Sequence, residues 1–466
     1  MRTPLPLPRL ATSALTAALL ATAPLAAHAT AAPSLAQAMG ALDAQPASAF
    51  VGQPGRRVRD AAEFERMKAY LRRHYDGVVA RHQFELEPGR TVDCIDALTQ
   101  PGARRQGLSR LTPAQWQGQA LPSAMPPSAP AASTGAGDRN TRDPGVFLWP
   151  ARGPGAVPEH DGDGRDRSCP DGTVPKLRLG LEQLTAFETL AHFRHKWGEP
   201  AGQQALGAAP HEYADAYQSI TNYGAESYLN VWKTYTEKTS EFSLSQIWVT
   251  GGSPVETVEA GWQVYRHRHL LNPKYPYFFI YSTQDGYNKT GCYDLECDDF
   301  VQTNKDVVIG GRWTNLSEVD GPQYSTAVKA RLDDGSDGAA CGWWIAVDGV
   351  WAGYYPCSLY DSGGIRNAAS FIDFGGEIVN TSPHGRHTMT DMGSGYKPSA
   401  GFGRAAYQRT IRYITMVDGQ ATFATPSLTE RRTGAGCYDI DAFYADGDWK
   451  TYFYFGGEGY DTGVCP

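Results

Sequence analysis

Two glutamates, Glu259 and Glu377, are the residues whose type and setting best suit acid–base chemistry in this sequence. Glu259 lies in the run TVEAGWQV and Glu377 in the run FIDFGGEIV, and both runs alternate in the way that predicts β-strands. Because side chains alternate between the two faces of a strand, Glu259 shares a face with Gly261 and Gln263, and Glu377 shares one with Gly375. A glycine beside each glutamate leaves room for a ligand or another backbone.

Paired carboxyl groups in one site can divide acid and base roles, because their mutual repulsion separates their pKa values. One carboxylate takes a proton from a water molecule as the water attacks a carbonyl carbon. The other carboxyl, still protonated, hydrogen-bonds the carbonyl oxygen and then protonates the leaving amine. This chemistry needs neither a metal nor a cofactor. The residues alone leave open which glutamate is the base, and also whether both simply face solvent on a sheet surface.

Other catalytic motifs are weaker. The sequence contains neither HExxH nor GxSxG, so metallopeptidase and α/β-hydrolase mechanisms lack their motifs. The pairs His267-x-His269 and His384-x-x-His387 offer two imidazoles each, whereas a zinc site usually needs three or four ligands. We therefore expect no metal site.

Short alternating runs separated by turn residues dominate the second half of the chain and must position these glutamates. Together with 51 Gly and 31 Pro, they favour strands and turns over a helical bundle. The pattern predicts an all-β, antiparallel two-sheet β-sandwich. The strand-like runs cover 227–231, 242–249, 257–265, 277–283, 343–347, 371–379, 406–415 and 451–455.

The first half of the chain has a different texture. Apolar residues at three- and four-residue steps predict a helix within 60–79, and a second amphipathic helix is expected around 181–195. Residues 112–168 are rich in Pro, Ala, Gly and Ser, a composition that predicts a disordered linker. We therefore expect a small mixed α/β domain, divided by this linker, before the sandwich.

Export is predicted by the first residues and by the cysteines. Positive charge, an Ala/Leu-rich run and the small-x-small site Ala27-His28-Ala29 are typical of a signal peptide over 1–29, and we expect no membrane anchor. The 8 cysteines then favour disulfides in an oxidising compartment, extracellular or periplasmic. Eight cysteines allow 105 pairings. Spacing favours Cys292–Cys297, Cys341–Cys357 and Cys437–Cys465, which leaves Cys94 and Cys169.

Charge is divided unevenly between the two halves. Residues 210–466 hold 19 Lys+Arg against 31 Asp+Glu, a balance of −12, and the first 209 residues hold the remaining 23 and 19, a balance of +4. A basic front part and an acidic back part can attract each other, and protonation of carboxylates weakens that attraction. An acidic main domain also argues against a nucleic-acid partner.

Long blocks of the sequence resemble the neprosin family of glutamic peptidases. HEYADAYQSITNYGAESYLNVWKTYTEKTSEFSLSQIWV is similar to the start of the family's peptidase domain, and VEAGWQV, FIDFGGEIVN, MGSGYKPSAGFGRAAY and DGDWKTYFYFGGEGYDTGVCP resemble later blocks in order. In the front half, TVDCIDALTQPG and CPDGTVPKLR are similar to the family's activation-peptide region. The resemblance covers the chain from about residue 60 to its end, except the linker, and the signal peptide points to a bacterial-type homologue.

The resemblance implies a secreted endopeptidase made as a zymogen, with Glu259 and Glu377 as the catalytic pair, active in acid and cleaving after proline. Its partners would be protein or peptide substrates and its own propeptide, which acts as an intramolecular inhibitor. The expected organisation is a signal peptide (1–29), propeptide parts at 30–111 and 169–209 around the linker (112–168), and a peptidase domain (210–466). The candidate polar supports are Gln246, Gln263 and Tyr355, and the aromatics that line a groove or else pack in the core are Trp262, Tyr281, Tyr287 and Trp344.

Two other functions use the same features. A β-sandwich glycosidase also works with two carboxyl groups, and the distance between them is informative. A non-catalytic module that binds carbohydrate or protein would instead use the aromatic surface. Replacing either glutamate by glutamine separates the enzymes from the module, because only an enzyme loses turnover.

Overall fold

The computed structural model describes residues 32–112, 141–142, 160–162, 164–196, 211–336, 340–381, 385–434 and 436–465. The expected signal peptide, most of the expected linker and the stretch before the expected domain boundary at 210 lie outside these residues. Within the described part of the chain, no helix is long and apolar enough to span a membrane.

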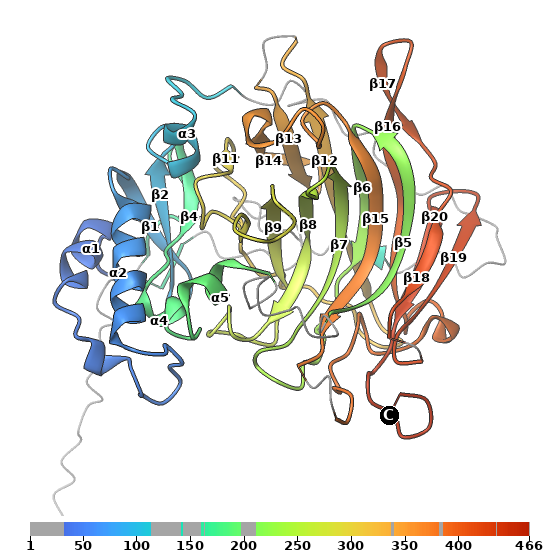
Figure 1. Cartoon of the computed structure of the whole chain (residues 1–466), viewed down its shortest axis with the longest axis horizontal. Coiled ribbons are helices and arrows are strands. Elements are labelled where there is room, and N and C mark those ends of the chain that lie inside the picture. The colour runs from blue at the N-terminus through green and yellow to red at the C-terminus, as the bar shows by residue number, and fades with distance from the viewer. Residues whose placement is uncertain are drawn as a thin grey trace, which may run out of the picture. The chain divides into compact units, whose positions relative to one another are not determined.

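The front part of the chain combines helices with a small antiparallel sheet (Figure 1). The sheet has the order β1-β2-β4, and the helices α1 and α2 precede it in the chain while α3, α4 and α5 follow its first two strands. The strands are β1 (Ala80–Glu87), β2 (Arg90–Asp96) and β4 (Thr173–Leu177), and the helices are α1 (Leu35–Leu42), α2 (Ala61–Tyr75), α3 (Pro101–Arg105), α4 (Leu181–Leu184) and α5 (Leu190–Arg194).

Helix α2 forms where the apolar spacing predicts it. The Asp60 side chain caps its N-terminus by accepting a hydrogen bond from the Glu63 backbone N–H (2.7 Å). Basic residues fill its last turn, where they complement the negative end of the helix dipole. Phe64, Met67 and Leu71 are fully buried, so the apolar stripe faces the interior of the front part.

A seven-stranded antiparallel sheet carries both candidate glutamates. Its order is β10-β9-β8-β7-β15-β5-β18, so strands distant in sequence become neighbours in space. The strands are β10 (Cys292–Tyr293), β9 (Tyr277–Thr283), β8 (Glu256–Tyr265), β7 (Phe242–Gly251), β15 (Ala369–Val379), β5 (His211–Asn222) and β18 (Thr429–Arg432).

A second sheet of ten strands packs against the first. Its order is β11-β14-β13-β12-β6-β16-β20-β19, with β17 paired to β16 and the two-residue β3 paired in parallel to β12. The strands are β11 (Val301–Gln302), β14 (Val350–Pro356), β13 (Gly342–Val347), β12 (Gln323–Asp333), β6 (Gly224–Asn230), β16 (Ala406–Val417), β20 (Lys450–Gly456), β19 (Asp439–Ala445), β17 (Gln420–Ala424) and β3 (Thr141–Arg142).

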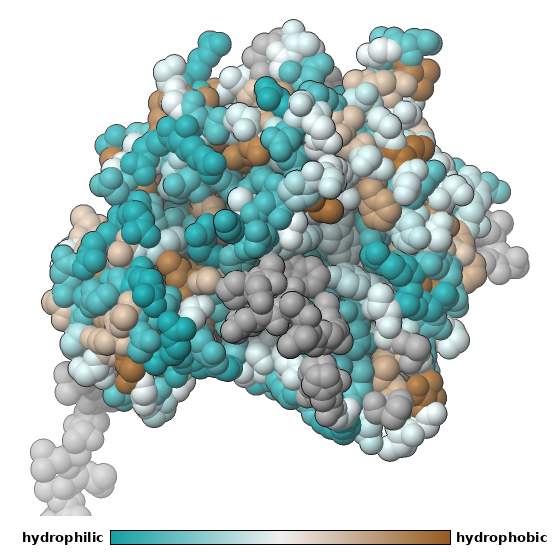
Figure 2. Space-filling view, in the orientation of Figure 1, coloured by the Kyte–Doolittle hydropathy of each residue, from teal (hydrophilic) through white to brown (hydrophobic). Residues whose placement is uncertain are grey.

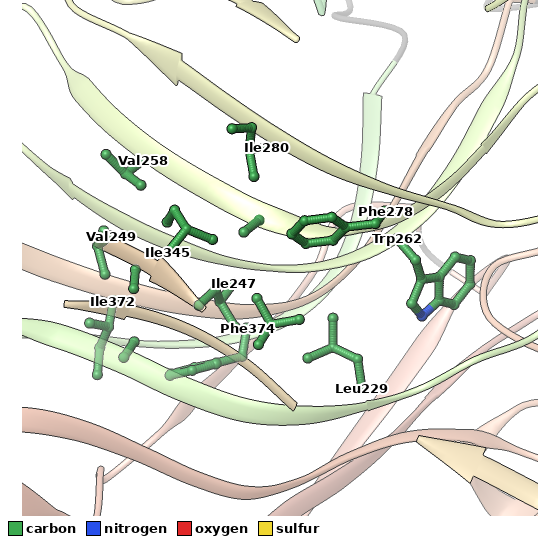
Figure 3. Close-up of a cluster of buried hydrophobic side chains, with 14 of the residues drawn as sticks. Leu229, Ile247, Val249, Val258, Trp262, Phe278, Ile280, Ile345, Ile372 and Phe374 are labelled. Atoms are coloured by element: carbon green, nitrogen blue, oxygen red, sulfur yellow. The ribbon is translucent and has the colours of Figure 1, made fainter. Parts of the chain in front are cut away.

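The main hydrophobic core lies between these two sheets. Val258 and Ile280 of the first sheet meet Leu229 and Ile345 of the second, and all four side chains are buried (Figure 3). Each buried aliphatic side chain of this size contributes roughly 1.5–3 kcal/mol. The mostly β, antiparallel, sandwich-like fold expected from the sequence is confirmed, as is the small helical N-terminal region.

The surface is mostly polar on the face in view. Figure 2 shows hydrophilic residues and residues of intermediate hydropathy over most of the visible described surface, with apolar residues in small separate patches. Scattered apolar residues of this kind are normal on a folded domain.

Two expectations for the front part are corrected. The single helix expected around 181–195 is two short helices, because the turn between α4 and α5 gives its Thr185 carbonyl to the backbone N–H groups of Arg57 and Val58. The end of the expected linker is also ordered. The Asp161 carboxylate accepts hydrogen bonds from the backbone N–H groups of Glu85 (3.1 Å) and Arg165 (2.8 Å). Residues 160–162 and 164–168 therefore form a turn against β1.

The four disulfides of the structure join the pairs favoured by spacing and the remaining two cysteines. Cys292–Cys297, Cys341–Cys357 and Cys437–Cys465 are local, whereas Cys94–Cys169 spans 75 residues. The long-range bond therefore ties together the two sides of the expected linker.

Candidate active site

The two glutamates point from different strands to the same side of the seven-stranded sheet. Strand β7 lies between the two strands that carry the glutamates. Glu259 on β8 pairs with Trp248 of β7, and Glu377 on β15 pairs with Leu244 of β7, four residues before Trp248. Gln246 lies between Leu244 and Trp248 on β7 and faces the same side. We call this side, which carries Glu259, Glu377, Gln246, Trp248 and Leu244, the glutamate face.

Lys196 bridges the two carboxylates. Its ammonium nitrogen Nζ is 2.7 Å from Glu259 Oε2 and 2.7 Å from Glu377 Oε2. The two oxygens are therefore at most 5.4 Å apart, twice that distance. All three side chains are almost fully buried, and the ammonium also lies 5.5 Å from the centre of the Trp248 ring. Two carboxylates in this geometry can hold one small polar group between them.

The remaining hydrogen-bond partners differ between the glutamates. Glu377 has nitrogen partners: His211 Nδ1 at 2.6 Å and the Gln246 amide at 3.4 Å. Glu259 has hydroxyl partners: the Tyr287 phenol donates to Oε1 at 2.5 Å and Thr257 at 3.1 Å. The two carboxyl groups are thus held in chemically different environments.

The electrostatics follow from burial and from these contacts. Burial raises the pKa of Glu377, but the Lys196 ammonium and His211 outweigh this effect, so the pKa lies below its ordinary value. Burial lowers the pKa of Lys196, yet Glu259 and Glu377 together raise it above its ordinary value. Burial and then the Glu259 charge raise the pKa of Tyr287 well above 10.0, so its phenol stays a hydrogen-bond donor.

Residues of the front part cover the glutamate face. Leu184, Phe187 and Phe193 belong to the same buried cluster as Leu244 and Trp248, so α4 and α5 are packed onto this side of the sheet (Figure 1). Lys196 follows α5 directly and extends from this cover into the site.

The loop closed by the Cys292–Cys297 disulfide also contacts the front part. Tyr70 donates its hydroxyl to the Glu296 carbonyl (2.5 Å), and the Lys176 ammonium donates to the Leu295 carbonyl (2.6 Å). The Arg194 guanidinium lies 3.3 Å from the Cys297 sulfur. These polar contacts anchor the cover at a second place.

A second acidic pair lies on the same side of the sheet. Asp373 and Asp215 are both buried, and Arg431 pairs with each of them, at 2.9 Å from Asp373. Burial and then the neighbouring Asp215 raise the pKa of Asp373 well above its ordinary value. This cluster carries its own counter-charge, unlike the glutamates, whose counter-charge comes from Lys196.

The sequence-predicted supporting residues divide into two groups. Gln246 and Tyr287 contact the glutamates directly. The Tyr281 hydroxyl accepts from the Lys196 backbone N–H (3.5 Å) and its ring stacks on Tyr287 at 6.0 Å. Gln263 shares the face of Glu259 but donates to Tyr293 (3.1 Å).

Trp262, Trp344 and Tyr355 are not part of the site. Trp262 points to the opposite side of β8, into the core between the sheets, where it donates to the Asn230 carbonyl at 3.0 Å (Figure 3). Tyr355 lies in the same core with its ring 4.9 Å from that of Phe300. Trp344 packs in a separate cluster of the second sheet. Strand alternation on β8 turns Trp262 away from the glutamate face, and Trp344 and Tyr355 belong to strands of the second sheet.

Three residues of the site were not found from the sequence: Lys196, His211 and Thr257. Thr257 stands two residues before Glu259, so alternation alone could have placed it on the same face. His211 opens a strand whose pairing with β15 is not visible in the sequence. Lys196 reaches the site through the tertiary packing of the front part, which no local pattern encodes.

The described residues contain two groups of three that could in principle hold a metal ion, His387 with Cys437 and Cys465, and Cys292 with Cys297 and Asp299. In both groups the cysteines are joined in disulfides, so their sulfurs are not available as thiolates. His267 contacts Thr239 (2.7 Å), and His269 stacks on the Tyr277 ring at 3.5 Å.

Comparison with known proteins adds a family. Residues 239–458 match the family model described as Neprosin. Scytalido-glutamic peptidase with a peptide-based transition-state analogue is similar over 53% of this chain and 97% of its own, at 8% identity and a TM-score of 0.26. The eqolisin-family peptidase SCP-B in a complex with the tripeptide Ala-Ile-His is similar over 53% and 97%, at 9% identity and a TM-score of 0.24.

Proposed function

We propose that this chain, whose residues 239–458 form a domain of the neprosin family, is a glutamic endopeptidase made as a zymogen. Membership of that family supports a glutamic peptidase as the activity, and the matched range contains both Glu259 and Glu377. The catalytic residues, the inhibitory segment, the working pH and the substrate are the proposed parts.

One observation carries the proposal: two buried carboxylates of distant strands converge on one ammonium nitrogen, 2.7 Å from each. A buried carboxylate pair is costly unless a counter-charge or a shared proton compensates it. In the precursor Lys196 supplies that charge. When Lys196 leaves, the position between Glu259 and Glu377 is of the right size and polarity for a water molecule.

The mechanism follows from this geometry. A water molecule in the place of the ammonium gives a proton to one glutamate while its oxygen attacks the peptide carbonyl carbon. The other glutamate, protonated, hydrogen-bonds the developing oxyanion and then protonates the leaving nitrogen as the C–N bond breaks. Tyr287 and Gln246 hold the carboxyl groups in place, which keeps the reacting atoms in reach of each other.

Residues 30–209 form the proposed propeptide, divided by the linker. The cover formed by α4 and α5 buries the glutamate face, and Lys196 occupies the catalytic position, so a substrate cannot reach it. Removal of this segment requires cleavage between Lys196 and the peptidase domain, and we propose that cleavage falls within 197–210.

Acidic conditions favour both activation and turnover, because both depend on protonation of a glutamate in the site. Lys196 is held by ionised Glu377, whose pKa lies below its ordinary value. Protonation of that carboxyl removes a partner of Lys196 and weakens the cover. The free enzyme then needs one protonated and one ionised glutamate, a state that two close carboxyl groups reach in acid.

Cleavage after proline is supported by the residues around the glutamates. Trp248, Tyr281, Tyr287 and Tyr213 place aromatic rings on the glutamate face. Flat apolar surfaces of this kind suit the rigid, apolar proline ring. The resemblance to the neprosin family points to the same specificity.

Secretion, to the extracellular space or the periplasm, is the proposed location. Four disulfides in a chain of this size are typical of an oxidising compartment. The front part and its Cys94–Cys169 bond would then fold after export.

The carboxyl separation does not distinguish a peptidase from a retaining glycosidase, whose carboxyl groups lie roughly 5–5.5 Å apart. The test is therefore chemical. The acidified precursor is incubated with a peptide library and, in parallel, with soluble polysaccharides, and the products are identified by mass spectrometry. We expect cut peptide bonds with proline on the N-terminal side and unchanged polysaccharides. Sugar release without peptide cleavage would overturn the proposal.

A further inference from the structure

His211, the first residue of β5, lies beside Glu377 and has no role in the reaction proposed above. Its Nδ1 is 2.6 Å from Glu377 Oε1, and both side chains are almost fully buried. Tyr213, two residues further along β5, pairs directly with Glu377 across the strands, so His211 reaches the carboxylate from the next position on the same face.

The surroundings fix the imidazole ring. The Phe242 ring meets it edge-on at 5.6 Å, and the Tyr213 ring stacks beside it at 6.5 Å. The charged and titratable groups around it include Glu377, Glu259, Lys196 and Tyr213. Burial lowers the pKa of His211, and its hydrogen bond to Glu377 opposes this shift without reversing it. A neutral imidazole that donates from Nδ1 to a carboxylate fits these contacts.

Departure of Lys196 leaves the two glutamates unequal. Glu377 keeps two nitrogen partners, His211 and Gln246, whereas Glu259 keeps the hydroxyls of Tyr287 and Thr257. An amide or imidazole N–H can only donate, so it stabilises the ionised carboxylate. A hydroxyl can donate to a carboxylate and can also accept from a carboxylic acid, so it tolerates both protonation states.

We propose that His211 is a positioning residue that holds Glu377 ionised and oriented as the general base, which leaves Glu259 as the proton donor. This inference rests on the proposed peptidase function. In the first step a water proton passes to Glu377 as the water oxygen bonds to the carbonyl carbon. In the second step the Glu259 proton passes to the nitrogen as the C–N bond breaks. The proton on Glu377 then returns to Glu259 through the next water molecule.

The test compares two substitutions of His211 in the full-length chain. Asparagine keeps an N–H donor near the position of Nδ1, whereas leucine keeps much of the volume and removes the donor. The variants are activated in acid, or with a trace of activated wild-type enzyme if they do not activate themselves. Their kcat, KM, pH profiles and thermal unfolding are measured on a proline-containing peptide.

We expect His211→Leu to lower kcat about 10–100-fold, the range that loss of an orienting hydrogen-bond partner costs at metal sites. KM should stay within twofold, and the acid limb of the kcat profile should move to higher pH, because Glu377 loses a donor that favours its ionised form. His211→Asn should restore most of kcat and the position of that limb. A purely structural histidine would not produce a pH shift that the asparagine variant corrects.

His387→Asn is the matched control. His387 also contacts a glutamate, Glu212, at 2.8 Å, but Glu212 follows His211 on β5 and therefore faces the opposite side of the sheet. We expect wild-type kcat and an unmoved pH profile for this variant. If His211→Leu likewise retains wild-type kcat and acid limb, or if both His211 variants lose activity in proportion to their loss of folded protein, the positioning role is wrong.

The inference can fail separately from the proposed function. If the wild-type protein cleaves no peptide, the proposed function is wrong, and the role of His211 is then tested by NMR titration of the Glu377 carboxyl in the full-length chain. A higher Glu377 pKa in His211→Leu than in wild type supports the positioning role. An unchanged pKa contradicts it.

Discussion

At the scale of single residues, Lys196 is the group on which the proposed inhibition depends. Its ammonium is the counter-charge for two buried carboxylates that belong to different strands. Breaking a buried ion pair by removing one partner typically costs about 3–5 kcal/mol, because the other charge is left uncompensated.

Lys196→Met should therefore weaken the cover of the precursor. Methionine keeps much of the apolar stem but leaves Glu259 and Glu377 facing each other without a counter-charge. We expect self-cleavage at pH 6 to accelerate at least 10-fold relative to the wild-type precursor, followed on gels over time. Lys305→Met, at an exposed ion pair with Asp171, is the control and should convert at the wild-type rate. Equal rates for all three proteins would show that Lys196 does not restrain the site.

Tyr287 should affect turnover after activation. Its phenol donates to Glu259 Oε1 at 2.5 Å, so Tyr287→Phe removes one hydrogen bond from a carboxyl group that must keep its orientation. We expect kcat to fall roughly 10-fold, with a small change in KM. Tyr360→Phe removes another buried hydroxyl, bound to Ser282 at 2.8 Å, and should leave kcat unchanged. A kcat for Tyr287→Phe equal to that of Tyr360→Phe contradicts a role at the site.

The sequence singled out the two glutamates, which the structure brings together at Lys196, but it did not reveal most of their partners. Alternation placed Glu259 and Glu377 on strand faces, and the resemblance to a family made them a pair. Lys196 and His211 contact them across 63 and 166 residues of chain, respectively. Such contacts depend on sheet order and on the packing of the front part, which have no local signature in the sequence.

At the scale of secondary-structure elements, the glycines beside the glutamates have a definite use. A Cβ atom on Gly261 would lie 2.1 Å from the Ser245 carbonyl oxygen and 2.6 Å from Gln246 Cα. On Gly375 it would lie 2.5 Å from Asp215 Cα. Of the two expectations, room for a ligand or for another backbone, the structure shows the second, because neighbouring strands approach closely at both positions.

Gly261→Ala should therefore destabilise the peptidase domain. The clash is with backbone atoms of β7, which cannot move without disturbing Gln246 and the strand pairing around it. We expect a loss of roughly 1–3 kcal/mol of unfolding free energy, measured by denaturant titration. Gly363→Ala is the control, because a Cβ there would meet nothing within 4 Å. A Gly261→Ala protein as stable as the control would contradict the close approach.

Strand prediction succeeded where apolar contrast is strong and missed strands where it is weak. β7, β8 and β15 alternate Val, Ile, Phe or Trp with polar residues or glycine, whereas β9 begins with a continuous aromatic and aliphatic run. The positions of all four were predicted within a few residues. β5 was not predicted as a strand, because its core-facing positions include Ala214 and Ala216, whose small side chains give little contrast. The order of the strands within each sheet also required the structure.

At the scale of the whole molecule, we expect pH to change how firmly the front part is held on the peptidase domain. Glu377 has a lowered pKa, so the hold on Lys196 is present above the ordinary carboxyl value of 4.5 and is lost as pH falls through the lowered value. Burial and then Arg57 lower the pKa of His267 to about 4. The folded precursor therefore binds a proton on His267 more weakly than the unfolded chain does. Its stability declines as pH falls from 6.5 toward 4.

The shift of His267 from 6.5 to about 4 corresponds to about 3 kcal/mol when the group is fully protonated. Asp294 acts in the opposite direction: burial raises its pKa to about 7, so its contribution favours the precursor in acid and is lost as pH rises through 7. We expect Glu377 and His267 to outweigh Asp294 in the pH dependence of the precursor. The precursor should therefore convert fastest below about pH 4.5.

His267→Gln should make conversion less steep between pH 4 and 6.5, because the variant has no imidazole to protonate there. The measurement is the half-life of the precursor at half-unit pH steps. His82→Gln is the control, because this half-buried histidine contacts the Asp166 carbonyl on the front part, and the variant should keep the wild-type slope. Identical slopes for both variants would show that His267 takes no part.

The Cys94–Cys169 bond should keep the front part together after the linker is cut. β2 and β4 are paired on either side of the linker, and the disulfide closes a loop of 75 residues. A bond of that span contributes about 4 kcal/mol in the chain-entropy model. After limited proteolysis of the linker, we expect one band on a non-reducing gel and two on a reducing gel. Separation without reductant would contradict the pairing.

The most direct test of the central claim is the turnover of Glu259→Gln and Glu377→Gln on a proline-containing peptide in acid. Each variant is pre-cut by activated wild-type enzyme and repurified, and Glu318→Gln at an exposed position is the control. We expect a loss of at least roughly 10²-fold in kcat for both site variants, with thermal unfolding close to that of the control. Turnover by either site variant within tenfold of the control would contradict a catalytic pair built from these two carboxyl groups.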